Sequence, residues 1–133
     1  MNWGLSLEEA IRFHGHLGPW LVIGYRCGEL ARRILKPNDH HDLICIIKIP
    51  AKTPFACSID GVQASTSCTA GKMNIRVEES DDFEYIFTKH SSGETIKLKV
   101  RKEIVDKLTS TLSLEEAAKK IMELDLWSLF ELS

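Results

Sequence analysis

Two histidines lie two residues apart in the stretch His14-Gly15-His16, directly ahead of Gly18 and Pro19. In an extended or turning segment, residues i and i+2 can direct both rings at one point, and the flanking glycines give the backbone room to do so. The pattern fits a pair of metal ligands, an acid/base pair or two polar loop residues. Its spacing alone does not choose among them.

A second candidate segment runs from Cys57 to Cys68, eleven residues apart with small polar residues between them. Structural zinc sites usually pair cysteines two to four residues apart, and this spacing misses that pattern. Two cysteines that bracket a short polar helix can still converge. By contrast, Cys45 lies in the apolar run Leu43–Ile49, so we interpret it, and Cys27, as core residues.

Together these side chains allow two chemistries. His14, His16, Cys57 and Cys68 could form a Cys₂His₂ site for zinc or a similar divalent transition metal, with an open position if one ligand is left out. Asp60 could orient an imidazole from behind. Alternatively, Cys57 or Cys68 is a nucleophile activated by a histidine and a helix N-terminus. Spacing leaves both open.

The segment around Gly71-Lys72 resembles a phosphate loop only superficially. That loop requires G-x-x-x-x-G-K-[ST], whereas this chain has Thr66 and Met73 at the outer positions. A phosphate loop is therefore rejected. Lys72 remains available as a donor to an anionic ligand or partner.

The composition predicts one soluble globular domain over residues 1–133, with 44% hydrophobic and 27% charged residues. A net charge of −2 lacks the basic footprint of a nucleic-acid-binding protein. No apolar run approaches the ~18 residues that span a membrane, and no signal-peptide pattern begins the chain. We therefore expect a cytoplasmic protein, with no membrane or nucleic-acid partner, whose cysteines are not disulfide-bonded.

Periodicity predicts the elements that hold these residues. Ser6 and Glu9 form a capping box for a first helix over residues 7–13, and Pro19 begins a second helix that ends before Pro37. Gly24 and Gly28, one turn apart, would let another backbone approach closely. A short helix is expected over 57–66, a helix over 101–108 and another from Ser113 to about residue 124. The apolar tail is expected to dock on the body.

Four segments read as strands: residues 43–49, 73–79, 83–90 and 95–100. The first is nearly continuous and apolar, so we expect it to be central and buried on both faces. The predicted fold class is α+β, with a mixed sheet of about four strands packed by helices.

Two long motifs then point to a family. The segments FHGHLGPWLVIGYRCGELA, from Phe13, and CSIDGVQASTSCTAGKMNI, from Cys57, resemble the FmdE family, named for the E subunit of molybdenum formylmethanofuran dehydrogenase. The resemblance covers residues 13–26 and 57–75. It implies an α+β core that usually forms a homodimer, without the C-terminal zinc finger that some members add.

The resemblance also implies a site. Carried over by position, it draws on His14, His16, Cys57 and Cys68, with Asp60, Gln63, Thr69 and Lys72 nearby for cofactor binding. The chain departs from the family pattern at three positions. Gly18 stands where many members have a cysteine, Ser67 replaces a usual glycine, and Met73 replaces a residue that is often glycine.

The leading hypothesis is a metal-binding accessory or cofactor-handling protein, with zinc as the first choice of ion and a molybdenum or tungsten enzyme as partner. The second is a small cysteine/histidine-dependent enzyme with Cys57 or Cys68 as the catalytic thiol. The third is a dimeric interaction module with a vestigial site, which the glycine at position 18 favours.

Overall fold

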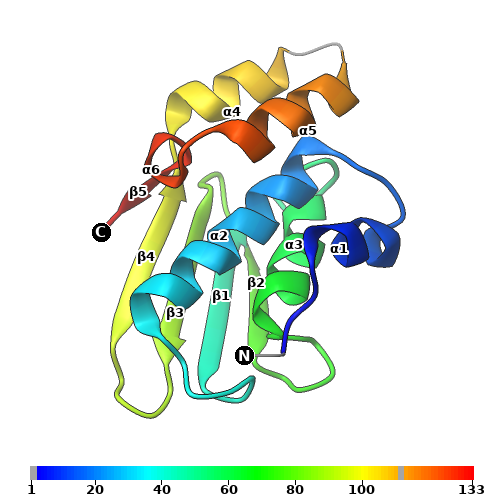
Figure 1. The fold of residues 1–133 in the computed structure, drawn as a ribbon. Helices are drawn as coiled ribbons and strands as arrows, with labels where there is room; N and C mark the ends of the chain where they lie inside the picture. Colours follow the sequence, from blue (N-terminus) through cyan, green and yellow to red (C-terminus); the bar gives the residue numbers. More distant parts are fainter. Residues whose placement is uncertain (1–2, 111–112) are drawn as a thin grey trace.

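The computed structural model describes residues 3–110 and 113–133, and within them one mixed sheet carries five strands in the order β2-β1-β3-β4-β5 (Figure 1). The strands are β1 (Leu43–Ile49), β2 (Ile75–Glu79), β3 (Glu84–Lys89), β4 (Thr95–Val100) and β5 (Phe130–Leu132). The helices are α1 (Leu7–His14), α2 (Pro19–Leu35), α3 (Cys57–Thr66), α4 (Lys102–Thr109), α5 (Leu114–Glu123) and α6 (Leu126–Leu129). The predicted α+β class is confirmed.

Strand directions explain where α3 lies. Strand β1 pairs in parallel with β2 and antiparallel with β3, and the remaining neighbours are antiparallel. A parallel pair needs a crossover connection, which is usually helical. Helix α3 is that connection, and it packs between α1 and α2 over the sheet (Figure 1).

The central strand differs from its prediction in one respect. Its alternate residues Leu43, Cys45, Ile47 and Ile49 are fully buried, whereas Ile44 on the other face is 37% exposed. The expectation that both faces are buried is therefore wrong, because α2 and α3 lie on the same side of the sheet, with α1 packed on them (Figure 1). Cys27 and Cys45 are completely buried, as predicted.

Local signals set the boundaries of the first two helices. The Ser6 hydroxyl accepts from the Glu9 backbone N–H at 3.1 Å, and the Glu9 carboxylate accepts from the Ser6 N–H at 2.9 Å, so the predicted capping box is present. Gly15 then ends α1 with φ 112°, a left-handed conformation suited to glycine. Pro19 opens α2 after the extended Gly18.

The tail supplies the fifth strand, which the sequence did not predict. Phe130 and Leu129 are fully buried, and β5 pairs antiparallel with β4. The Arg101 guanidinium donates to the Trp127 carbonyl at 2.8 Å. The predicted docking of the tail is confirmed. None of the helices in the described ranges is long and apolar enough to cross a membrane.

Candidate functional site

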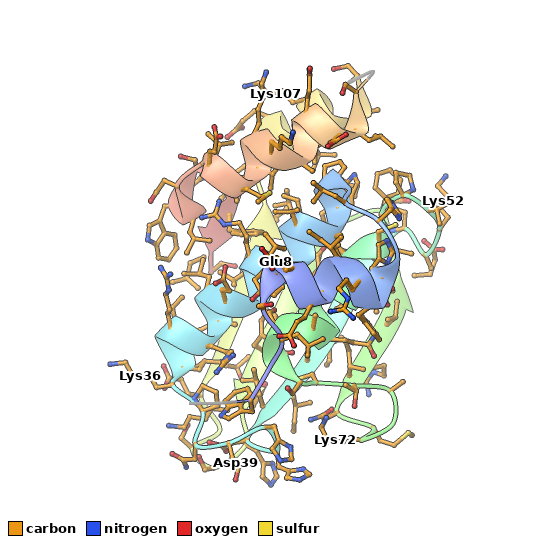
Figure 2. The ribbon with its side chains drawn as sticks, turned by 45° about the vertical axis from the view of Figure 1, so that its right-hand side comes forward. Glu8, Lys36, Asp39, Lys52, Lys72 and Lys107 are labelled. Carbon is orange, nitrogen blue, oxygen red and sulfur yellow. The ribbon has the colours of Figure 1, made fainter. Side chains whose placement is uncertain are left out.

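The centre of the candidate site is a contact between the end of α1 and the first turn of α3. His14 Nδ1 and Asp60 Oδ2 lie 2.6 Å apart, and the His14 side chain is only 11% exposed. Helix α1 packs against α3, and in Figure 2 α1, which carries the labelled Glu8, passes in front of α3. The imidazole contact suggested for Asp60 from the sequence is therefore present.

This contact sets the chemistry of the other ring nitrogen. An ionised carboxylate only accepts hydrogen bonds, so His14 Nδ1 donates to Asp60, and in the neutral imidazole Nε2 then carries the lone pair. His14 Nε2 is buried and has no hydrogen-bond partner among the described residues. A carboxylate behind one nitrogen and a free lone pair on the other is the usual arrangement of a metal-ligating histidine.

The second histidine lies beside the first. The His14 and His16 ring centroids are 4.7 Å apart, with His16 exposed. A Cβ built on Gly18 would lie 3.2 Å from His16 Nε2. In a family member with cysteine at this position, the thiol would therefore lie beside the His16 ring.

Cys57 carries a thiol on the same face of α3 as Asp60, three residues before it. It is the first residue of the helix, one turn before Asp60, and it is half-buried. Burial, and then the Asp60 carboxylate, raise the pKa of the Cys57 thiol. Without a bound cation this group is a thiol at neutral pH rather than a thiolate.

Cys68 is placed elsewhere. Its Sγ donates to the Leu43 carbonyl at 3.4 Å, and burial raises the pKa of its thiol. It follows α3, whereas Cys57 begins it; at 1.5 Å per residue the helix separates them by about 15 Å. In Figure 2, Lys52, in the loop before α3, lies well above Lys72, in the loop after it. One chain therefore does not bring the two cysteines together.

The remaining candidates build a hydrogen-bonded loop. Gln63 donates to Asp60 Oδ1 at 3.3 Å and accepts from the Ala70 N–H at 3.1 Å. Lys72 Nζ donates to Thr69 Oγ1 at 3.0 Å. Sequence reasoning missed Asn74, whose Oδ1 accepts from the Thr69 N–H at 2.8 Å. Its place at the end of the second motif was the available signal.

Two departures from the family pattern have a structural explanation. Ser67 and Met73 adopt φ angles of 61° and 60°, in the left-handed region that glycine tolerates best. The glycines usual at these two positions in the family thus match the local backbone. Met73 in this left-handed conformation does not belong to a strand. Strand β2 therefore begins at Ile75 rather than at the predicted residue 73.

Taken together, His14 contacts Asp60, His16 lies beside His14, and Cys57 precedes Asp60 by one helical turn, while Gln63 ties Asp60 to the following loop. Within residues 3–110 and 113–133, no three His, Cys, Asp or Glu side chains are already gathered with the geometry of a metal site.

One comparison with known proteins gives a match. A family model described as "FmdE, Molybdenum formylmethanofuran dehydrogenase operon" matches residues 13–131. The matched region contains every residue of the candidate site. No curated protein matches the chain.

Proposed function

Because the chain belongs to the FmdE family, we propose that it is a metal-binding accessory or cofactor-handling protein. It works in the cytoplasm as a homodimer, beside a molybdenum- or tungsten-dependent enzyme of the formylmethanofuran dehydrogenase type. The description of the family model, which names the operon of such an enzyme, supports the choice of partner.

The observation that carries the metal proposal is His14. Its Nε2 atom is buried and has no hydrogen-bond partner among the described residues, and its Nδ1 is hydrogen-bonded to Asp60. A buried polar group left unpaired costs about 1–3 kcal/mol, so a partner at Nε2 is expected. These features fit a zinc ligand.

The proposed ligands are His14 Nε2, a nitrogen of His16 and the Cys57 thiolate. Nitrogen and thiolate donors suit zinc, and three protein ligands leave a fourth position open. Bound zinc would supply Lewis acidity at that position. Cys68 is assigned to the core, because its thiol is buried against the Leu43 carbonyl.

The thiol-enzyme alternative has less support. A nucleophilic cysteine needs a depressed thiol pKa, whereas burial raises the pKa of both Cys57 and Cys68. The Asp60 carboxylate also opposes ionisation of the Cys57 thiol. The same carboxylate is an advantage when it orients a metal-ligating histidine.

Elemental analysis after zinc reconstitution and desalting tests the proposal. The wild-type chain should retain about one zinc ion. His14→Ala and Cys57→Ala should retain little, because a three-ligand site loses most of its zinc affinity when one ligand is removed. His41→Ala, at an exposed histidine in the loop before β1, is the matched control and should retain zinc.

Cys68→Ala separates this ligand set from the original Cys₂His₂ hypothesis. A folded Cys68→Ala variant that keeps its zinc supports the assignment of Cys68 to the core. Wild-type protein that retains no metal, or site variants that retain as much as wild type, would contradict the proposal.

A further inference from the structure

A directional chain of hydrogen bonds ends at the candidate metal ligand. The Ala70 N–H donates to Gln63 Oε1, Gln63 Nε2 donates to Asp60 Oδ1, and Asp60 Oδ2 accepts from His14 Nδ1. The three distances are 3.1, 3.3 and 2.6 Å. These hydrogen bonds therefore link the backbone amide of Ala70, in the loop after α3, to His14, the last residue of α1.

The first group fixes the direction of the chain. A backbone N–H can only donate, so Gln63 must turn its amide oxygen toward Ala70. The amide nitrogen of Gln63 then necessarily faces Asp60. Glutamine is suited to this position because it is a donor at one end and an acceptor at the other, which neither glutamate nor an apolar residue of the same length can be.

The loop that contains the Ala70 N–H is itself held in place by side-chain hydrogen bonds. The Asn74 side chain accepts from the Thr69 N–H at 2.8 Å and donates to the Leu43 carbonyl at 3.3 Å. This second bond ties the loop to β1. The starting point of the chain is thus held by the sheet rather than by solvent.

We propose that Gln63 is a positioning residue for His14. Its amide oxygen accepts from the Ala70 N–H, so its NH₂ group donates to one oxygen of Asp60. The other Asp60 oxygen then accepts from His14 Nδ1, and the lone pair of the neutral imidazole lies on Nε2. This proposal rests on the proposed function only in that the lone pair of His14 Nε2 then binds zinc. The orienting effect itself is a property of the metal-free protein.

The variant Asp60→Asn exposes this effect. An asparagine can face His14 with either its oxygen or its NH₂ group. The Gln63 donor attracts the oxygen, so the NH₂ group faces His14 Nδ1, and the imidazole must then carry its hydrogen on Nε2. Zinc affinity should fall by about 10–100-fold, as it does when an orienting partner is lost.

Removal of Gln63 should have opposite effects in the two backgrounds. In the wild-type chain, Gln63→Met removes an anchor of Asp60 and should lower zinc affinity by roughly several-fold. In the Asp60→Asn chain, the same substitution frees the asparagine to turn its oxygen toward His14. Affinity and the Nδ1–H tautomer should then partly recover, which a loss of packing alone would not produce.

The readouts are the ¹⁵N chemical shifts of His14 in chelator-treated protein, which distinguish the Nδ1–H from the Nε2–H tautomer, and zinc affinity by competition. Thr95→Val is the control, because it removes an exposed hydroxyl that bonds Thr88 between β3 and β4 and leaves the Ala70–Gln63 bond. It should change neither readout.

The inference is overturned if the double variant shows no more Nδ1–H tautomer than Asp60→Asn, or if Thr95→Val matches the effect of Gln63→Met. Its failure is distinguishable from that of the proposed function. A wild-type chain that binds no zinc would defeat the metal proposal, while the tautomers of the metal-free variants would still decide the role of Gln63.

Discussion

Position 18 shows how one missing side chain shapes the candidate site. Gly18 precedes α2 in an extended conformation, φ −141°, that any residue can adopt. Its Cα faces the His16 ring, and a Cβ there would meet only His16 atoms within 4 Å. Because His16 is exposed, its ring can move by the few tenths of an ångström that a side chain requires.

Gly18→Cys should therefore fold normally and bind zinc more tightly, by about tenfold, because the new thiol adds a fourth ligand next to His16. The N-terminus of α2 also favours the thiolate. Competition against a chromophoric chelator measures the change. Gly18→Ala is the control for the added bulk, and equal affinities of the two variants would show that the cysteine does not reach the ion.

At the scale of elements, glycines set the distance between α2 and α3. A Cβ on Gly61 would lie 2.2 Å from the Leu21 carbonyl oxygen and 2.4 Å from the Tyr25 backbone nitrogen. A Cβ on Gly24 would lie 2.0 Å from the Ser58 carbonyl oxygen. The backbones of the two helices are thus in direct contact, which fixes the position of Asp60 relative to the neighbouring helices.

Gly61→Ala should destabilise the protein by about 1–3 kcal/mol, the usual cost of overpacking, despite the better helix propensity of alanine. Backbone atoms cannot rotate away, so the helices must separate. Urea unfolding gives the free energy. The control is Gly71→Ala, where a Cβ would meet nothing closer than 4.0 Å and φ is not positive; equal midpoints for the two variants would contradict the close packing.

Much of this arrangement could be predicted from the sequence, and the remainder has physical reasons. Gly24 and Gly28 were recognised because they lie on one predicted helix at helical spacing. Gly61 was not, because the polar stretch around it carries little apolar periodicity. Likewise, the His14–Asp60 contact follows from residue types, but the separation of Cys57 from Cys68 depends on α3 remaining helical over its full length.

For the whole molecule, the C-terminal segment completes the sheet. Phe130 is fully buried beside β4, whereas Leu132 in the same strand is 47% exposed. A three-residue strand carries too little pattern to be predicted from sequence. Its apolar side chains nonetheless indicated correctly that the tail would dock, because their burial is favourable in any conformation.

Phe130→Ala should lower the free energy of unfolding by about 3–5 kcal/mol, through lost burial and the cavity left behind. Small domains have about 5–15 kcal/mol in total, so this loss is severe. Leu132→Ala should cost less than about 1 kcal/mol, since much of that side chain already contacts water. Chemical denaturation distinguishes them, and similar losses would show that the tail is not docked as described.

The burial of the cysteines has a consequence for oxidative damage. Cys27, Cys45 and Cys68 are enclosed in the core, while Cys57 is partly exposed. Peroxides react with accessible thiols, which they convert stepwise to sulfenic and sulfinic acids. The first lesion therefore falls on Cys57, at the rim of the fold. An oxidised population would keep its sheet and helices intact while losing the thiol that begins α3, one turn before Asp60.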